Sequence, residues 1–316
     1  MEKVGVAQVD HQVGFRLFED SGIRAHLHAH DAVGWMREAV LAHGKDALSA
    51  PPRVHAALGE GAGGLVFTAG RFAGKSYGFR AYSTLELPVD EQVVVAFDDH
   101  TGRVCAIAVG SELGVRRTSA LGGVAHDALA PKGSVRVAVI GSGVQAQGQL
   151  WALQAVRSIT EVKLFSKTPD RKVRVAEALD QQYDFPVVSA ESVEEAVAAA
   201  DVVILATNSE SPVLRTQWLR PDAYVATLGP KQVGRAEFAA DLLAAASVIT
   251  TDSVAQLNAY DPPAVAAEAG VAVAPLSQYV LAPPPAEGIR LYLSVGLAGT
   301  EPYLLQRLAQ QVAAQA

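Results

Sequence analysis

The second half of the chain alternates short apolar runs with longer segments in which apolar positions recur at helical spacing. Apolar runs of about four to eight residues predict strands, and apolar positions three or four apart predict helices. The run 201–206 carries few charges, as is typical of a parallel strand buried on both faces. Strands alternating with helices predict a doubly wound parallel sheet. The expected strands are 135–140, 161–165, 186–189, 201–206, 223–228 and 247–250, and the expected helices are 149–158, 171–182, 192–200 and 235–246.

The segment before residue 130 has a different pattern, in which strand-like runs are separated by Gly, Pro and Asp. An amphipathic helix is expected at 33–42, where Asp31 can act as the N-cap. Near the other end, a proline run at 283–285 precedes a predicted strand at 290–295 and a predicted helix at 300–313. The other elements expected in the first segment are strands at 63–68, 76–84, 92–98 and 104–109, a turn at 99–102 and a helix at 117–129.

These patterns predict two domains, which agrees with a length of 316 residues. We expect an α+β domain for substrate binding and dimerisation, built from residues 1–118 and 289–316. A Rossmann-type domain with a doubly wound parallel sheet, residues 119–288, is inserted between its parts. The predicted fold class is therefore α/β.

A glycine loop, Gly-x-Gly-x-x-Ala, follows the predicted strand 135–140 and precedes a helix, the context that a dinucleotide fingerprint requires. Gly141 permits the tight turn, Gly143 lets the backbone approach a pyrophosphate, and Ala146 keeps the helix close to the sheet. The helix N-terminus offers free N–H groups to phosphates. An ordinary strand-to-helix turn is the alternative. The residues expected to bind a cofactor here are Gly141, Ser142, Gly143, Val144 and Gln145.

The tip of the second predicted strand indicates which dinucleotide binds, because an acidic residue there accepts from the ribose 2′-hydroxyl of NAD. No carboxylate stands at this tip, and we interpret Asp170, which follows Pro169, as a helix cap. The pattern favours NADP(H), with NAD(H) as a possible cofactor and a solvated basic loop as the alternative. The residues expected to hold the 2′-phosphate are Ser166, Lys167, Thr168 and Arg171.

Composition excludes several classes of function. The net charge of −7 argues against broad nucleic-acid affinity, which requires a basic surface. The single cysteine, Cys105, rules out an intrachain disulfide, and we expect it to be an inert core residue. The start, Met1–Val4, lacks the layout of a signal peptide, and no apolar run approaches the length of a membrane span. We therefore expect a soluble, cytoplasmic protein without nucleic-acid or membrane partners.

Three histidines, His26, His28 and His30, would share one face if their segment were a strand. A metal site also needs ligands from distant segments, and none stands out. We expect no metal here, and we interpret the segment as an exposed strand or a strand at a dimer edge.

Several segments together resemble the ornithine cyclodeaminase/mu-crystallin family over most of the chain, from about residue 33 to 306. The carrying segments are residues 51–53, 98–103, 116–120, 141–146, 206–209, 228–229 and 294–298. The resemblance implies the fold predicted above and a homodimer built through the sheets of the N-terminal domains. It also implies reactions at an imine carbon next to a carboxylate, which include cyclodeamination, ketimine reduction and amino-acid dehydrogenation.

The resemblance also assigns individual roles. Arg53 and Arg117 resemble the arginines that hold the substrate carboxylate, a task that suits planar two-donor guanidiniums. Structural ion pairs are the alternative for both arginines. The remaining residues that the resemblance places near the cofactor are Thr207, Asn208, Ser209 and Gly229, with the backbone of Val295 and Gly296 beside the nicotinamide.

Two positions depart from the family pattern. Arg80 stands where the family usually has a lysine, and Lys231 stands where it usually has the aspartate presumed to transfer the proton. Arginine cannot act as an acid or base near neutral pH, although it can bind a carboxylate. A desolvated Lys231 can give or take a proton. Lys75 is a conceivable stand-in for the missing lysine, but we interpret it as a surface residue.

These features predict an NADP(H)-dependent oxidoreductase acting on the C–N centre of a small imino or amino acid, of the ketimine reductase or amino-acid dehydrogenase type. Arg53, Arg80 and Arg117 would orient the carboxylate, and Lys231 or a water would supply the proton. Two alternatives stay open. One is an ornithine cyclodeaminase-like ammonia-lyase with an internally recycled cofactor, and the other is a non-catalytic NADPH-binding protein of the mu-crystallin type.

Overall fold

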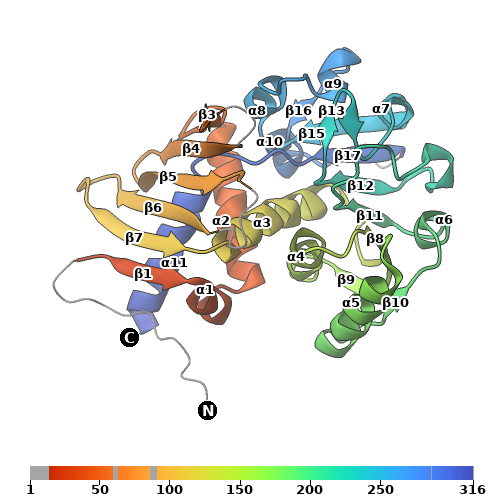
Figure 1. The fold of residues 1–316 in the computed structure, drawn as a ribbon, viewed down its shortest axis with the longest axis horizontal. Coiled ribbons are helices and arrows are strands. Elements are labelled where there is room, and N and C mark those ends of the chain that lie inside the picture. Colours follow the sequence, from red (N-terminus) through yellow and green to blue (C-terminus); the bar gives the residue numbers. More distant parts are fainter. Residues whose placement is uncertain (1–13, 60–62, 86–90, 286, 316) are drawn as a thin grey trace. The chain divides into compact units, whose positions relative to one another are not determined.

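The computed structural model describes residues 14–59, 63–85, 91–285 and 287–315. The segment Met1–Val4, discussed above for its lack of a signal-peptide layout, lies outside this range. The chain divides into two compact units, the first formed by residues 1–120 and 297–316 and the second by residues 121–296 (Figure 1). An α/β architecture with one domain inserted in another is therefore present.

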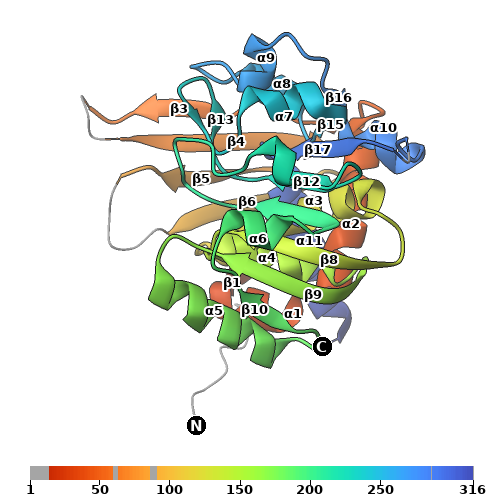
Figure 2. The ribbon, with the colours of Figure 1, turned by 90° about the vertical axis from the view of Figure 1, so that its right-hand side faces the viewer.

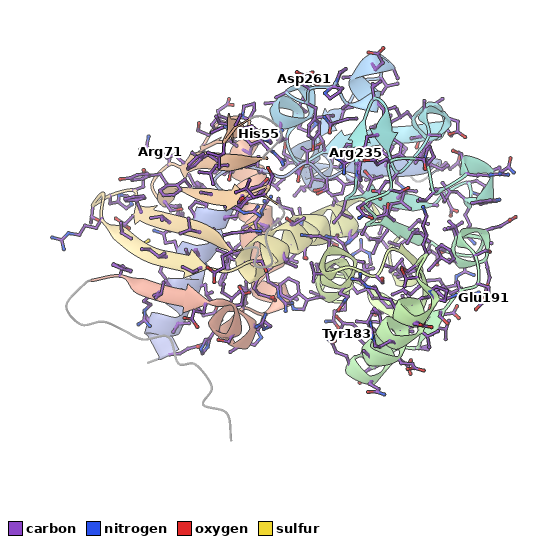
Figure 3. All side chains as sticks on the ribbon, viewed as in Figure 1. His55, Arg71, Tyr183, Glu191, Arg235 and Asp261 are labelled. Atoms are coloured by element: carbon purple, nitrogen blue, oxygen red, sulfur yellow. The ribbon has the colours of Figure 1, made fainter. Side chains whose placement is uncertain are left out.

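In the described part of the first unit, the strands form a seven-stranded sheet in the order β1-β7-β6-β5-β4-β2, with β3 paired to β4. Its pairs are antiparallel except for β1 and β7. The four strands and the turn predicted from the sequence are all found. Arg71, which is labelled in Figure 3, donates to Asp99 of this turn at 2.6 Å. The strands are β1 (Arg16–Glu19), β2 (Leu48–Ser49), β3 (Val54–Ala57), β4 (Gly64–Phe72), β5 (Ser76–Ser83), β6 (Gln92–Asp98) and β7 (Val104–Val109).

Helix α11 (Thr300–Gln315) packs against β4, β5, β6 and β7, and α2 (Ala29–His43) packs against α11 (Figure 1). The histidine segment is not a strand, because α1 (Asp20–His26) ends at His26 and α2 begins at Ala29. Asp31 consequently lies in the first turn of α2, and the N-cap position belongs to His28. The helix was predicted to start at Val33 because the apolar residues of its buried side begin near there. The helix itself begins four residues earlier.

Helix α3 (Glu112–Leu129) starts in the first unit and continues into the second. It begins five residues earlier than the pattern predicted. The carboxylate of Asp20 explains this start, since its Oδ1 accepts from the backbone N–H of Glu112 at 2.9 Å. A carboxylate at a helix N-terminus satisfies an otherwise unpaired N–H and opposes the helix dipole. The cap comes from a residue far away in the sequence, so local spacing gave no sign of it.

The second unit contains an eight-stranded sheet in the order β10-β9-β8-β11-β12-β17-β15-β16, and all its pairs are parallel. Figure 2 shows the succession from β17 through β12 and β8 to β9. The strand order reverses between β8 and β11, the kind of switch point at which doubly wound sheets bind ligands. The strands are β8 (Ser134–Ile140), β9 (Ser158–Phe165), β10 (Val187–Ser189), β11 (Val202–Leu205), β12 (Tyr224–Thr227), β15 (Ala246–Thr251), β16 (Ala274–Pro275) and β17 (Ile289–Leu293).

The predicted strand at 290–295 belongs to this sheet and not to the first domain, where the sequence analysis placed everything from residue 289 on. Strand β17 pairs with β12 and β15, and all its residues are buried. The second unit therefore ends at Gly296. An isolated apolar run has no property that reveals which of two sheets it joins.

The helix predicted at 235–246 is wrong in its first half. Residues 231–236 form a hairpin of β13 (Lys231–Gln232) and β14 (Arg235–Ala236), with Gly234 in its turn at a φ of 79°. A positive φ of this size suits glycine in a turn, and the pairing of Arg235 and Ala236 with β13 replaces the predicted start of the helix. The remaining elements of the unit are α4 (Val144–Leu153), α5 (Pro169–Gln182), α6 (Val193–Val197), η1 (Thr216–Trp218), α7 (Ala240–Ala245), α8 (Val254–Asn258), α9 (Val265–Glu268) and α10 (Leu276–Leu281).

Candidate active site

A pocket of about 730 Å³ lies in the second unit and is lined by segments that follow β8, β9, β11 and β12. Parallel strands bring their carboxyl ends to one edge of a sheet, so these loops meet there. The volume is within the range of pockets that bind small molecules and cofactors. It brings together all but two of the expected cofactor residues: Gly141, Ser142, Gly143, Val144, Gln145, Ser166, Lys167, Thr168, Arg171, Thr207, Asn208, Ser209 and Gly229.

The glycine loop has the geometry that a pyrophosphate needs. Gly141 adopts a φ of 120°, and a Cβ there would overlap the carbonyl oxygen of Ala206. Gly143 is the N-cap of α4, and a Cβ there would meet no atom within 4 Å. The first glycine is thus required by the fold, whereas the second leaves open space beside the N-terminal amides of a helix. The side-chain oxygen of Gln145, also in the pocket, is buried without a hydrogen-bond partner among the described residues.

The loop after β9 adds positive charge to the pocket. Lys167 and Thr168 are exposed, and Arg171 lies close enough for Nη2 to donate to the Ser142 carbonyl at 3.5 Å. The Ser142 hydroxyl donates to that of Ser166 at 3.1 Å. No carboxylate is among the described residues that line the pocket.

Asp170 does not cap α5 as predicted. Thr168 holds the N-cap position, Pro169 follows it, and Asp170 is the next residue of the helix. Proline at the first helical position already has the backbone angle of the helix and needs no N–H partner, so the helix starts at Pro169, two residues earlier than an Asp170 cap would allow. Asp170 does not line the pocket. The preference for NADP(H) depends on the lack of a carboxylate at the strand tip, and the position of Asp170 does not change it.

One buried carboxylate near the pocket escaped the sequence analysis. Glu237 has no exposed surface, and it accepts three hydrogen bonds, from Thr207 N, Thr207 Oγ1 and Gly229 N. Burial raises the pKa of the Glu237 carboxyl, and the positive charge of Lys231 opposes this effect without cancelling it. Glu237 was missed because it lies in a segment predicted to be helical, where an acidic residue is an ordinary surface residue.

A second buried carboxylate, Asp252, follows β15 and holds the backbone after β17. Its oxygens accept from Val295 N at 2.9 Å, Gly296 N at 3.0 Å and the Tyr292 hydroxyl at 3.0 Å. Val295 and Gly296 are therefore fixed at the carboxyl end of a strand in the same sheet, although they are not among the residues that line the pocket.

The first unit contains a buried charge cluster, which we define as Arg80, Arg117 and Glu301. Arg80 Nη1 lies 3.2 Å from Glu301 Oε1, and Arg117 Nη2 donates to the same oxygen. Gln92 Oε1 accepts from Arg80 Nε at 2.9 Å. Burial alone would raise the pKa of Glu301, but attraction to the two guanidiniums outweighs it and holds this pKa below its usual value. The cluster keeps one net positive charge.

Part of the cluster is left available for further hydrogen bonds. Within the described residues, Nε and Nη1 of Arg117 and Oε2 of Glu301 are buried without partners. Arg117 is 5% exposed, so these donors are largely removed from water. Buried N–H donors that lack a protein partner are costly unless a ligand or water meets them. Their chemistry suits a carboxylate.

Comparisons with known proteins agree with this geometry. The sequence profile of the ornithine cyclodeaminase/mu-crystallin family matches residues 21–298. The chain belongs to the ornithine cyclodeaminase/mu-crystallin family. The resemblance inferred from the sequence is thereby confirmed.

Two relatives and one solved structure show how far the similarity to other family members extends. Ketimine reductase mu-crystallin of Mus musculus is 30% identical over 151 residues, 48% of this chain and 47% of that protein. Delta(1)-pyrroline-2-carboxylate reductase of Bacillus cereus is 29% identical over 161 residues, 51% and 49% of the two chains. The chain thus matches about half the length of these relatives. The structure of Thermococcus litoralis Delta(1)-pyrroline-2-carboxylate reductase in complex with NADH and L-proline shares the fold, with a TM-score of 0.83, 23% identity and coverage of 95% and 98%.

The two positions that depart from the family pattern have different surroundings. Arg80 belongs to the buried charge cluster, and its guanidinium lies 4.5 Å from the centre of the Tyr82 ring. Lys231 is 4% exposed on β13, and its ammonium donates to the Gly229 carbonyl at 2.6 Å. Lys231 does not line the pocket. Its charge faces the loop that carries Gly229.

Two other basic residues, Arg53 and Lys75, are not part of the buried charge cluster. Arg53 is half-buried just before β3. Lys75 lies in the turn between β4 and β5, is 44% exposed, and pairs with Glu38 at 3.4 Å, as expected of a surface residue.

The structure also bears on the cysteine, on a metal site and on a membrane span. Burial raises the pKa of the Cys105 thiol to about 11, so the half-buried thiol is protonated and unreactive at neutral pH. In the described part of the chain, no three His, Cys, Asp or Glu side chains gather in a way that could hold a metal ion. None of the described helices is both long and apolar enough to cross a membrane.

Proposed function

We propose that this protein is an NADP(H)-dependent oxidoreductase that reduces the C=N bond of a small imino acid, or catalyses the reverse oxidation. The observation that carries the proposal is the pocket at the carboxyl ends of β8, β9, β11 and β12, formed by the glycine loop. A dinucleotide fits this site by shape and by its helix N-terminus. The names of the two curated relatives, a ketimine reductase and a pyrroline-2-carboxylate reductase, indicate the bond on which the cofactor acts.

The cofactor, when bound, would supply or accept a hydride at its nicotinamide ring. The chain's residues bind and orient it. The amides at the start of α4 would hold the pyrophosphate beside Gly143, and the loops with Thr207 and Gly229 would hold the nicotinamide half. Fixing two reactants in a reactive geometry is itself a large source of rate enhancement.

We assign the preference for NADP(H) to the loop after β9. Lys167 and Arg171 contribute positive charge to the pocket, and Ser166 and Thr168 contribute hydroxyls. These groups suit a 2′-phosphate, whereas no carboxylate is present to accept from a 2′-hydroxyl in this part of the described structure. NAD(H) is the alternative. We also propose a cytoplasmic location, as expected from the sequence.

The buried charge cluster is our candidate for recognition of the substrate carboxylate, together with Arg53. Glu301 pairs with both guanidiniums of the cluster, so one net positive charge remains to attract an anionic ligand. The unpartnered Nε and Nη1 of Arg117 point to different edges of the guanidinium, so each can donate a separate hydrogen bond to a carboxylate oxygen. Arg80 serves binding only, because an arginine stays protonated at neutral pH.

Lys231 remains our candidate for the proton donor, with a water molecule as the alternative. Its hydrogen bond to the Gly229 carbonyl holds the ammonium near the cofactor loop. We expect Lys231→Ala to lower kcat by about 100-fold or more, the lower end of the range for general acid–base catalysis, and to change the affinity for NADPH much less. An unchanged kcat in this variant would rule out the role.

A single assay separates this function from the two alternatives. NADPH absorbance is followed with cyclic and linear imino acids, and in reverse with amino acids, while ammonia is measured in parallel. Stoichiometric consumption of NADPH with formation of an amino acid supports the oxidoreductase. Ammonia release without net cofactor turnover indicates the cyclodeaminase type, and NADPH binding with neither reaction indicates a binding protein.

We also propose a homodimer formed through the sheet of the first unit. A Cβ on Gly78 would touch Pro302 of α11, so Gly78 faces the helix and the next residue, Phe79, faces the opposite side. On that side, strand pairing aligns a continuous apolar row: Leu17, Ile107, Val95, Phe79 and Ala69. A second copy of the chain can cover this apolar face.

A further inference from the structure

The buried carboxylate of Glu237 connects two loops that line the cofactor pocket. Its Oε2 accepts from Thr207 N at 2.9 Å and from Thr207 Oγ1 at 2.8 Å, and its Oε1 accepts from Gly229 N at 2.7 Å. Thr207 follows β11 and Gly229 follows β12, which are neighbouring strands. Glu237 itself is not among the residues that line the pocket. It lies outside the pocket lining, and its hydrogen bonds link two of the loops that form this lining.

The surroundings of Glu237 are built to admit this carboxylate. A Cβ on Gly229 would overlap both Glu237 Oε2 and the carbonyl oxygen of Thr207, so only glycine permits the close approach. The backbone of Glu237 is fixed on both sides, because its N–H donates to the Pro230 carbonyl at 3.0 Å and its carbonyl accepts from Val213 N at 2.9 Å. Val213 also lines the pocket.

The sheet order indicates which half of a dinucleotide these loops meet. The loop after β9 reads the adenosine end, and the glycine loop after β8 holds the pyrophosphate. β11 and β12 continue the sheet on the other side of β8. Thr207 and Gly229 therefore lie toward the nicotinamide half, at the opposite end of the pocket from Lys167.

We propose that Glu237 is a positioning residue for the nicotinamide half of the cofactor. It holds the loops after β11 and β12 in the binding geometry without touching the cofactor. The inference rests on the proposed function in that it requires a nicotinamide dinucleotide in this pocket. It adds a residue outside the pocket lining whose effect is confined to one half of the ligand.

The test compares the whole cofactor with its adenosine end. Affinities of Glu237→Gln for NADPH and for adenosine 2′,5′-bisphosphate are measured by isothermal titration calorimetry. The variant keeps the side-chain shape but presents an amide N–H₂ to one or more of the three donors, so a repulsive contact replaces at least one hydrogen bond. We expect NADPH to bind about tenfold more weakly, equivalent to about 1.4 kcal/mol, and the bisphosphate to bind within about twofold of the wild type.

The exposed Glu268 of α9 provides the matched control, because Glu268→Gln makes the same chemical change away from the pocket and should leave both affinities unchanged. Glu237→Asp keeps the charge and should give a smaller loss for NADPH alone, which keeps the inference testable if the glutamine variant does not fold. Equal weakening of both ligands, or no weakening of either, would overturn the positioning role.

The outcome for the wild-type protein separates this inference from the proposed function. If the wild type binds neither NADPH nor NADH, the proposed function and this inference both fail. If the wild type binds NADPH and the Glu237 variants show no selective loss, only the positioning role fails.

Discussion

Gly141 and Gly143 are glycines for different physical reasons. Gly141 has a φ of 120° and no room for a Cβ beside Ala206, so the fold needs it with or without a ligand. Gly143 has open space around the position of a Cβ, so the folded protein alone does not need it. We therefore attribute the glycine at position 143 to the space that a bound ligand needs there.

This difference predicts opposite outcomes for two equivalent substitutions. Gly141→Ala should lower the free energy of unfolding by about 1–3 kcal/mol through backbone strain, with a further cost from the steric overlap. Gly143→Ala should keep the stability within about 0.5 kcal/mol and weaken NADPH binding by about tenfold. Urea unfolding and calorimetric titration measure the two effects. Tight NADPH binding by Gly143→Ala would contradict the placement of the pyrophosphate.

The choice between NADPH and NADH depends on single side chains at the tip of β9. Lys167→Glu places a carboxylate where the 2′-phosphate is expected, so it should repel NADPH and provide an acceptor for a 2′-hydroxyl. We expect the ratio of NADPH to NADH affinity to fall by about tenfold or more. Lys163→Glu on the same strand is the control. An unchanged ratio in the Lys167 variant would remove this residue from the 2′-phosphate site.

At the scale of elements, Glu301 joins three segments of the first unit. Its carboxylate on α11 meets Arg80 of β5 and Arg117 of α3, and it lies without exposed surface. Removing one partner of a buried ion pair leaves uncompensated charge and commonly costs about 3–5 kcal/mol. The cluster therefore holds the helices against the sheet while it keeps two guanidiniums in place.

The lowered pKa of Glu301 predicts a specific pH dependence. A carboxyl whose pKa is depressed by folding adds stability above its unfolded value, near 4.5, and this stability is lost as the pH falls toward the folded pKa. Glu301→Gln should be about 3–5 kcal/mol less stable than the wild type at pH 7. The difference should shrink below a pH of about 4.5. Urea unfolding at several pH values measures it, and a difference independent of pH would contradict the assignment.

The sequence predicted the longer strands of both sheets, because buried parallel strands and an alternating meander have strong patterns, but it did not predict the short strands β1, β2, β3 and β16. It also predicted the glycine loop and the residues around it, since strand order alone brings the ends of β8, β9, β11 and β12 to one edge. It failed where the determinant is not local. The cap on α3 comes from Asp20, and the sheet that β17 joins depends on its partners.

The same reason explains which site residues were missed. Glu237, Asp252 and Glu301 are buried carboxylates whose roles depend on donors far away in the sequence. An acidic residue in an amphipathic segment normally points to solvent, so nothing in the local pattern marks these three. A surplus of buried basic side chains over their acidic partners would indicate a buried carboxylate. Which side chains are buried, however, is known only from the structure.

For the whole molecule, the apolar row across the first sheet predicts self-association. Leu17 and Phe67 are 41% and 37% exposed, and the strand pairing sets further apolar side chains on the same face. We expect Phe79→Glu to convert a dimer into a monomer, because a charge in the centre of an apolar interface is strongly unfavourable. Sedimentation velocity measures the mass. Val188→Glu, a matched change at an exposed apolar residue of the second unit, should leave the dimer intact. A wild-type monomer at micromolar concentration would contradict the proposal.

We propose that hydride passes between a nicotinamide cofactor in this pocket and the carbon of a C–N bond. The most direct measurement is isotope transfer from NADPH labelled with deuterium at C4, with either face labelled in separate reactions, to a panel of imino acids. We expect an amino acid with one deuterium at its α-carbon from one of the two labelled cofactors, and one NADPH consumed for each product. Ammonia release without net NADPH consumption, or an amino acid without deuterium from either labelled cofactor, would contradict it.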